Sequence, residues 1–379
     1  MGAPGMRLAA WSLAFGAVLA AAAAQAAALP PVRHVFVIVL ENKSFEHTFG
    51  PQAHSEYLGR ELPARGALLT QYHGIGHYSL DNYLALISGQ APNEETQMDC
   101  LQFSEFRPSA PALNADGQLP GKGCVYPKIV RTLPDQLEAA GLTWRGYMED
   151  MGKNPDRDRA SCAHVPVGTR EITDEATATD QYATKHDPFV YFHTIIDDRA
   201  RCESHVVNLE LLRQDLQSEA RTPNYVFITP NLCNDGHDDP CADGRPGGLA
   251  AIDGFLREWV PLIEASAAFR RDGLLVITFD ESSSISAAGS TACCGERGLP
   301  GAKDPPGLSG PGGGRIGAVV LSPFVQAGTV SERPYNHYAL LRTVAQLFGL
   351  APLGYAGGAH LEGFGADVFT AAAPRPPAR

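Results

Sequence analysis

Two apolar runs in this chain each end in a pair of oxygen-bearing side chains: Glu41-Asn42 after residues 35–40, and Asp280-Glu281 after residues 274–279. Carboxylate and amide oxygens are the ligands that hard divalent cations prefer, so Ca²⁺, Mg²⁺ and Mn²⁺ suit such a set. Glu41 and Asn42 alone could equally well begin a solvated loop. If the two runs are neighbouring strands, however, all four side chains meet at one edge of a sheet. The repeated pattern therefore favours a metal site.

Ser79 stands between a Gly-containing turn, residues 73–78, and a segment with helical spacing, residues 80–89. A Ser at the start of a helix usually caps it, and Ser79 fits the N-cap. Exposed amides and the positive end of the helix dipole would also favour a phosphate there. A hydroxyl beside a cation and a bound anion can act as a nucleophile. Both roles stay open for Ser79, and Asn82, one turn into the helix, is a candidate substrate-binding residue.

Further candidates are groups that could hold or move a proton: His77 beside the turn, Asp235 and His237 in one short loop, His186 before a proline, and His337 at a predicted helix start. A carboxylate and an imidazole two residues apart, as in Asp235 and His237, can share a metal or orient one another at a phosphate. A histidine in a turn is more often structural than catalytic. Because His186 precedes an aromatic cluster typical of a pocket wall, it is a candidate for substrate binding.

The elements that must position these groups alternate between strands and helices. The predicted strands are 35–40, 68–72, 143–148, 224–228, 274–279 and 315–322, and the predicted helices are 80–89, 132–140, 252–267 and 336–348. This alternation favours one doubly wound α/β domain. Most acidic and histidine clusters then fall at the carboxyl ends of strands or the starts of helices, where open α/β sheets bind ligands.

Length and composition narrow the class of protein. The chain has 379 residues, 44% of them hydrophobic, which is enough for a large core, and its formal net charge is −12. We expect no nucleic-acid partner, because an acidic protein of this size lacks a broad basic face.

The N-terminus, residues 1–27, has the features of a signal peptide: one positive charge at Arg7, an apolar core, and small residues at a cleavage site. A membrane anchor is the alternative; the short, Ala-rich run favours cleavage, and so no stable anchor. We expect a secreted or periplasmic protein with a catalytic domain over residues 33–368 and a disordered tail over residues 369–379. Eight cysteines fit an oxidising compartment, and the expected local pairs are Cys100–Cys124, Cys162–Cys202 and Cys233–Cys241, with Cys293 and Cys294 bridging each other or elsewhere.

Several stretches together resemble the phosphoesterase family: ENKSFEHTFG, GHYSLDNYLALISG, HDPFVYF, PNLCNDGHD, TFDE, GGGRIGAVVLSP and YNHYALLRTVAQLFGL. The resemblance runs in order from about residue 33 to residue 350. This family contains secreted acid phosphatases and bacterial phospholipases C, and it belongs to the alkaline-phosphatase-like superfamily. The resemblance implies an α/β fold with a mostly parallel central sheet sandwiched between helices.

The same resemblance implies roles for particular residues. Glu41, Asn42, Asp280 and Glu281 match the holders of a divalent metal, with Zn²⁺ open as well because histidines lie nearby, and Ser79 matches the nucleophile. His77, Asp235, His237 and His337 match groups around the phosphate. The predicted function is a secreted, metal-dependent phosphomonoesterase of the acid phosphatase type with a phosphoseryl intermediate. The alternative is a phospholipase C-type phosphodiesterase acting on phospholipids.

Overall fold

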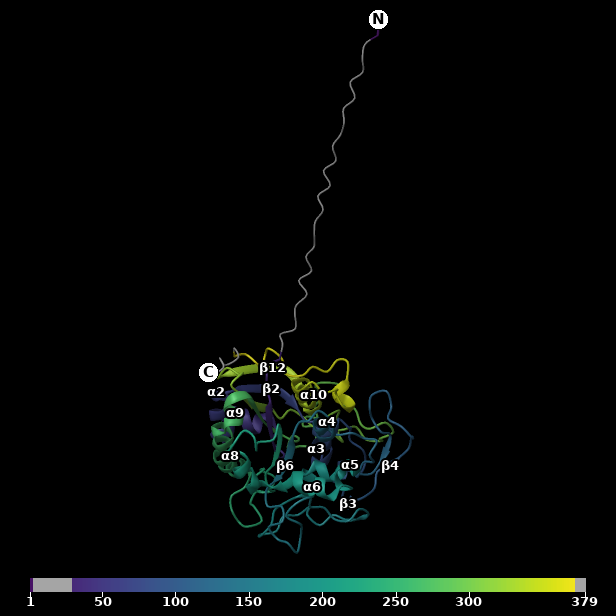
Figure 1. Ribbon diagram of the computed structural model, residues 1–379, viewed down its shortest axis with the longest axis vertical. Coiled ribbons are helices and arrows are strands. Elements are labelled where there is room, and N and C mark those ends of the chain that lie inside the picture. Colours follow the sequence, from purple (N-terminus) through teal and green to yellow (C-terminus); the bar gives the residue numbers. More distant parts are fainter. Residues whose placement is uncertain (3–28, 372–379) are drawn as a thin grey trace.

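The computed structural model describes residues 1–2 and 29–371, and a single eight-stranded sheet forms its centre (Figure 1). The strand order is β12-β2-β11-β10-β1-β9-β6-β8. The strands are β1 His34–Leu40, β2 Ala67–His73, β6 Trp144–Met148, β8 Val206–Asn208, β9 Tyr225–Thr229, β10 Gly273–Phe279, β11 Ala318–Leu321 and β12 Thr329–Asn336. Only β11 runs against its neighbours β10 and β2. The prediction of a mostly parallel α/β sheet is confirmed.

β1 lies in the middle of the sheet because six of its seven residues are apolar, and the seventh, His34, is hydrogen-bonded to Asp272. Each is buried, and the strand pairs in parallel with β10 on one side and β9 on the other. A strand covered on both faces needs such an unbroken apolar run, since neither face meets water. Its first polar residue after the run, Glu41, comes where the strand ends.

The main helices lie on both sides of this sheet. α8 and α9 lie to one side of the strands in Figure 1, whereas α3, α4 and α10 lie to the other. Their bounds are α3 Ser79–Ser88, α4 Leu133–Ala139, α8 Gly248–Ala265, α9 Ala267–Asp272 and α10 His337–Phe348. Shorter helices are α1 Phe45–Phe49, α2 Leu62–Arg65, α5 His193–Ile196, α6 Arg199–His205 and α7 Leu212–Asp215.

Sequence patterns predicted six of the eight central strands and missed β8 and β12. β8 has only three residues, too few for a periodic signal. β12 reads TVSERPYN, and its middle is exposed at the edge of the sheet, where polar residues and a proline are tolerated. Two small antiparallel pairs complete the strands: β3 Gln102–Phe103 with β7 Thr169–Arg170, and β4 Arg107–Pro108 with β5 Gly121–Lys122.

All eight cysteines form disulfides, and the three predicted local pairs are present: Cys100–Cys124, Cys162–Cys202 and Cys233–Cys241. Of the two options for the adjacent cysteines, the structure shows the bond between Cys293 and Cys294. The first two disulfides cross-link the long irregular segments between β2 and β9, where few strand pairings stabilise the chain.

The boundaries of the expected domain can be placed only in part. The expected signal peptide lies almost entirely outside the described residues, as do residues 372–379 of the expected tail. Within residues 369–371 the chain still makes contacts, because Phe369 packs against the core and the Ala371 amide donates to the Phe324 carbonyl oxygen.

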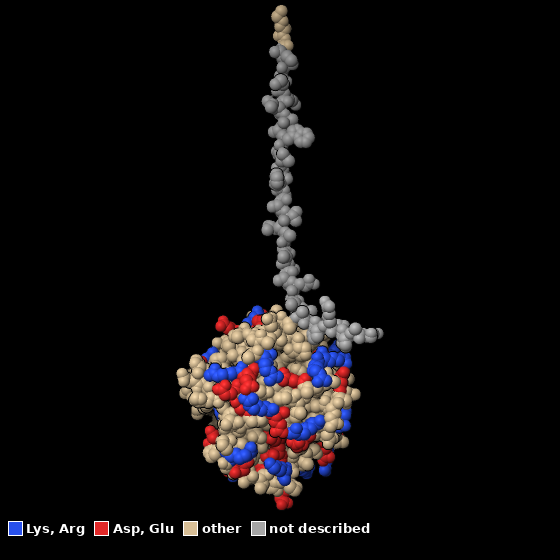
Figure 2. Space-filling view, turned by 90° about the vertical axis from the view of Figure 1, so that its left-hand side faces the viewer, with Lys and Arg blue, Asp and Glu red and all other residues tan. Residues whose placement is uncertain are grey.

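Charges of both signs are mixed over the face drawn in Figure 2, with no continuous basic surface among the described residues of that face. None of the helices in the described part of the chain is long and apolar enough to cross a membrane.

Candidate active site

The two oxygen-bearing pairs meet because β1 and β10 are adjacent, parallel and in step. Leu40 lies opposite Phe279, and the Asp280 amide donates to the Leu40 carbonyl oxygen at 2.9 Å. Glu41 and Asp280 therefore leave the sheet side by side. Asn42, at a φ of 54°, then turns so that its backbone amide donates to Asp280 Oδ1 at 3.0 Å. Glu41, Asn42 and Asp280 therefore lie together at this edge of the sheet.

Ser79 is the first residue of α3, and the prediction that it caps the helix is wrong. The N-cap is Tyr78, which makes no side-chain cap and has a φ of 71°, a strained value for a bulky residue. Backbone strain of this kind gathers at functional sites. The Ser79 hydroxyl, free of capping, donates to Glu41 Oε2 at 2.9 Å. Asn42 Nδ2 donates to the same oxygen at 3.1 Å.

The carboxylates of this cluster are buried so deeply that they resist ionisation. Burial, then the charges of Asp280 and Asp235, raises the pKa of Glu41 well above its usual value. Burial likewise raises the pKa of Asp280 to about 7 and moves the pKa of Asp235 in the same direction. Like charges held together out of water are costly unless a cation compensates them.

The donor set fits a divalent cation. Asp280 Oδ2, Asp235 Oδ2 and both ring nitrogens of His186 are buried, and none has a hydrogen-bond partner among the described residues. Unsatisfied buried acceptors beside one another are expected where a cation binds. Donor atoms of Glu41, His186 and Asp235 lie within 4.8 Å of one another, and neither Asp280 nor Glu281 belongs to that compact group.

His186 lies beneath Glu41, away from the pocket described below. Its Nε2 is 3.2 Å from Glu41 Oε1, and its Nδ1 is 3.3 Å from Asp235 Oδ2. Its ring stacks on Tyr83, whose hydroxyl donates to Glu41 Oε1 at 2.9 Å. His186 is 1% exposed and Asp235 fully buried. The structure thus places both against Glu41 rather than beside a substrate.

Glu281 reaches the site from a different direction. Its carboxylate is hydrogen-bonded to His77 Nδ1, and His77 Nε2 is 3.2 Å from the Gly289 carbonyl oxygen. Burial lowers the pKa of His77. His77 therefore braces Glu281 and the loop that follows it, and both of its ring nitrogens are occupied.

His337 does not reach the pocket. It is fully buried, with Nε2 2.6 Å from the Asp280 carbonyl oxygen and Nδ1 3.2 Å from the Tyr72 hydroxyl. Burial lowers its pKa to about 4, so the ring is neutral at ordinary pH. A neutral imidazole that donates from Nε2 and accepts at Nδ1 matches these two partners. His337 holds the backbone of Asp280 in place.

Asn82 is also buried behind the site. Its Oδ1 accepts from the Ile75 and Gly76 amides, and its Nδ2 donates to the carbonyl oxygens of Gly76 and Tyr78. The side chain therefore shapes the Gly-containing turn that presents Ser79. The structure does not bring it to the pocket where a substrate would bind.

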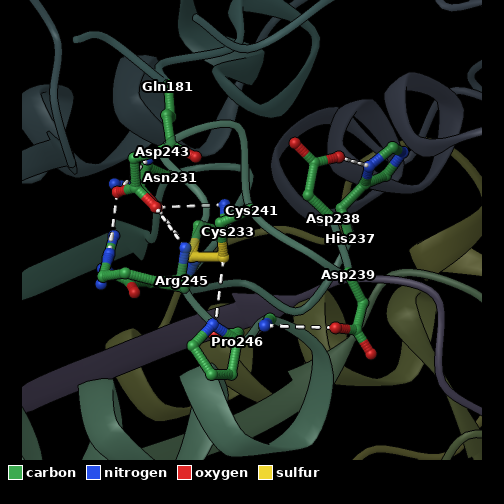
Figure 3. The surroundings of a disulfide bond; sticks show 12 residues. Gln181, Asn231, Cys233, His237, Asp238, Asp239, Cys241, Asp243, Arg245 and Pro246 are labelled. Carbon is green, nitrogen blue, oxygen red and sulfur yellow. Dashed lines mark hydrogen bonds and ion pairs between the residues drawn. A yellow bond between two sulfur atoms is a disulfide. The ribbon is translucent and has the colours of Figure 1, made fainter. Parts of the chain in front are cut away.

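His237 is the one predicted histidine that lines the pocket. The Cys233–Cys241 disulfide closes the loop that carries it (Figure 3). Asp235 Oδ1 accepts from the His237 backbone amide at 2.7 Å, and Asp238 Oδ1 lies 2.8 Å from His237 Nδ1. The side chain stays 35% exposed, so its other ring nitrogen is open to proton transfer.

A pocket of about 360 Å³ opens directly over these groups. Its lining combines the predicted site with a partly apolar rim: Asn42, Ser79, His237, Glu281, Tyr78, Met98, Asp99, Leu101, Asp174 and Lys185. The nucleophile candidate and the proton-transfer candidate thus face one space. That space has room for a phosphate and part of its alcohol.

Comparison with known proteins agrees with this geometry. The profile of the Phosphoesterase family matches residues 56–351. The chain belongs to the Phosphoesterase family. The match contains Ser79, Asp235, His237 and Asp280 and begins after Glu41 and Asn42.

Several proteins similar to this chain are named as phosphatases. A phosphate-repressible acid phosphatase of Penicillium chrysogenum is 29% identical over 88% of this chain and 65% of the relative. A phosphatidylinositol-3-phosphatase of Mycobacterium tuberculosis is 27% identical over 87% of this chain and 82% of the relative. The chain spans less than two thirds of the length of the fungal relatives it matches. Among solved structures, a protein of the alkaline phosphatase superfamily from Vibrio parahaemolyticus aligns with this chain at a TM-score of 0.47 and 11% identity. The alignment covers 86% of this chain and 69% of the Vibrio chain.

Three residues that sequence reasoning passed over contribute to the site of this family member. These residues are Tyr83, which donates to Glu41, and Asp99 and Lys185, which line the pocket. The only sequence feature that could have pointed to Lys185 is its position directly before His186. Burial alone would lower the pKa of Lys185, but the charges of Asp99, Asp174 and Glu41 outweigh burial and raise it. Lys185 is therefore a permanent cation in the wall of the pocket.

Proposed function

We propose that this chain is an exported, metal-dependent phosphomonoesterase in which Ser79 attacks the phosphorus of a phosphate monoester. One observation carries the proposal: the Ser79 hydroxyl faces a pocket, does not cap its helix, and donates to a carboxylate in a buried acidic cluster. The acid phosphatase and phosphatidylinositol-3-phosphatase names of the relatives support the same class of substrate.

A divalent cation would be held by Glu41, Asn42, Asp280 and Glu281. The second donor group, His186 and Asp235, would share Glu41 with it. Oxygen-rich donors favour Ca²⁺, Mg²⁺ or Mn²⁺, and His186 leaves Zn²⁺ open. When bound, such a cation offsets the negative charge of the substrate and of the attacking oxygen.

Three residues of the chain take separate roles in the proposed reaction: Glu41, Ser79 and His237. Glu41 orients the Ser79 hydroxyl through the hydrogen bond at Oε2. Attack by Ser79 Oγ forms an oxygen–phosphorus bond and breaks the bond to the ester oxygen, while the hydroxyl proton of Ser79 passes to Glu41 Oε2 and the alcohol leaves with a proton from His237. His237 then takes a proton from water, whose oxygen bonds to phosphorus, and Ser79 Oγ leaves with the proton returned by Glu41, which releases inorganic phosphate. Asp238 orients His237 for both transfers.

The test is hydrolysis of 4-nitrophenyl phosphate by the mature chain, with and without a chelator, for wild type and Ser79→Ala. We expect chelation to abolish most of the activity, and readdition of a divalent cation to restore it. Ser79→Ala should lower kcat by roughly 10³-fold or more, because Ser79 is the only Ser, Thr or Cys among the described residues that line the pocket. Full activity of Ser79→Ala, or indifference to the chelator in wild type, would contradict the proposal.

A parallel assay with 4-nitrophenyl phosphorylcholine separates the phospholipase C-type alternative. A preference for this diester over the monoester would replace the monoesterase assignment while keeping the same site.

Export is proposed on two grounds, the signal-like N-terminal sequence and the four disulfides. Disulfides of this number persist in oxidising compartments and are rare in reducing ones. Fractionation of cells that express the full chain, with detection of the shortened protein outside the cytoplasm, tests this part.

A further inference from the structure

Lys185 has no part in the mechanism above, yet it faces the same pocket as Ser79. It belongs to a short 3-10 turn, Thr184–His186, and its side chain is 8% exposed. Among the described residues that line the pocket it is the only Lys or Arg. A nearly buried ammonium beside a proposed phosphate site calls for a functional explanation as well as a structural one.

Two carboxylates hold this ammonium, and they differ in how firmly they are fixed. Lys185 Nζ is 3.2 Å from Asp99 Oδ2 and 3.1 Å from Asp174 Oδ1. The other oxygen of Asp99 accepts from the Leu80 amide at 3.0 Å, in the first turn of α3. Asp99 thereby ties Lys185 to the helix that starts with Ser79.

Asp174 is the looser partner. Its side chain is 34% exposed, against 9% for Asp99, and within residues 29–371 it makes no other ion pair. An ammonium has three N–H donors, and these two carboxylates use two of them. A substrate oxygen can therefore reach Lys185 either at the third donor or by displacing Asp174.

We propose that Lys185 binds a terminal oxygen of the substrate phosphate in place of Asp174, and that it selects monoester dianions over diester monoanions. The inference rests on the proposed function of the site. A monoester presents three terminal oxygens and two charges, whereas a diester presents two terminal oxygens and one charge. A cation in the wall of the pocket favours the species with the additional charge and oxygen. Displacement of Asp174 removes a negative charge that would repel a dianion more than a monoanion.

A purely structural role predicts something different. If Lys185 only neutralises Asp99 and supports α3, its loss would harm monoester and diester hydrolysis alike, because Ser79 serves both. The ratio of the two activities is thus the readout that separates binding from support.

The experiment compares 4-nitrophenyl phosphate with bis(4-nitrophenyl) phosphate, which release the same alcohol, in the metal-loaded mature chain. Lys185→Met should lower kcat/KM for the monoester by roughly 10- to 100-fold, the size of a charge-assisted hydrogen bond, and for the diester by less than about 3-fold. Lys185→Arg should recover part of the monoester activity. The inhibition constant of inorganic phosphate should rise by roughly tenfold or more in Lys185→Met.

Two further variants keep the test decisive if Lys185→Met folds poorly. Asp174→Asn retains Lys185 and Asp99, and should raise monoester kcat/KM by about 3-fold through a lower KM, with a smaller gain for the diester. Lys128→Met removes a lysine paired with Asp197 outside the pocket and should change neither activity.

Equal losses on both substrates in Lys185→Met, or no gain in monoester selectivity in Asp174→Asn, would overturn the inference. Neither result would affect the proposed function, whose own failure would appear as a wild-type chain that ignores the chelator or as an active Ser79→Ala variant.

Discussion

The ends of β1 and β10 look alike in the sequence but are fixed in the structure by different partners. After β1, Glu41 turns inward and meets Ser79, Tyr83 and His186. After β10, Asp280 supports the Asn42 amide and keeps one oxygen without a partner, while Glu281 pairs with His77. One strand end contacts Ser79, the proposed nucleophile, and the other contacts Asn42 and His77.

A third acidic strand end sharpens the comparison. β6 ends before Glu149 and Asp150, yet β9 separates it from β1. Glu149 instead accepts from the Asn231 amide and the Asn234 side chain. An acidic pair at a strand end thus becomes part of this site only when its strand neighbours β1.

The largest expected difference is between the two glutamates of the site. Glu41→Gln should lower kcat/KM for 4-nitrophenyl phosphate by roughly 10³-fold, because it weakens both the cation site and the orientation of Ser79. Glu281→Gln should lower it only about tenfold, since this side chain is already engaged with His77. Steady-state kinetics of both variants at saturating cation measures the difference. Equal losses would mean that the two strand ends contribute equally to the cation site.

The next effect concerns β6 and the pH dependence of stability. Burial raises the pKa of Glu149 from 4.5 to about 7, so the folded state holds this proton more tightly than the unfolded chain does. Its protonated form therefore stabilises fully below pH 4.5, and that stabilisation is lost as the pH rises through 7. The loss is at most about 3 kcal/mol.

Thermal unfolding of wild type and Glu149→Gln from pH 4 to pH 8 checks this value. The variant should have a flatter profile, and the exposed Glu210→Gln should follow wild type. A wild-type slope that persists in Glu149→Gln would assign the pH dependence to other groups.

A third effect tests cation binding without reference to catalysis. A divalent cation at 100 times its Kd should stabilise the wild-type chain by about 2.7 kcal/mol, seen as a rise in Tm. Asp280→Asn should lose most of that rise, and Glu281→Gln should keep more of it, because Asp280 Oδ2 has no other partner. An Asp280→Asn variant whose Tm rises with the cation as much as that of wild type would show that Asp280 does not hold the cation.

The smallest expected effect comes from Tyr83. Tyr83→Phe removes the hydrogen bond to Glu41 Oε1 and keeps the stacking on His186. A net hydrogen bond of about 0.5–1.5 kcal/mol corresponds to a loss in kcat of roughly 2- to 12-fold. Tyr72→Phe, a matched change behind His337, should have a smaller effect on kcat, because Tyr72 contacts no group of the pocket.

By itself, the sequence determined six of the eight central strands and the polar groups that follow β1 and β10. The apolar runs of β1 and β10 admit no solvated face, so each must lie inside a sheet and end at its first charged residue. Glu41, Asn42 and Asp280 could be named for that reason, and Ser79 because it stands between a Gly-containing turn and a helix. The disulfide pairs followed from the short spacing between successive cysteines.

Only the tertiary structure decided which groups face the pocket. A spacing along the chain shows that a histidine is near a turn, but not which neighbours take its ring nitrogens. His77 and His337 are held by Glu281 and the Asp280 carbonyl oxygen, and only His237 stays open. Lys185 gains its place from Asp99, which is 86 residues away in the chain. Contacts across such separations depend on packing, and no local pattern records them.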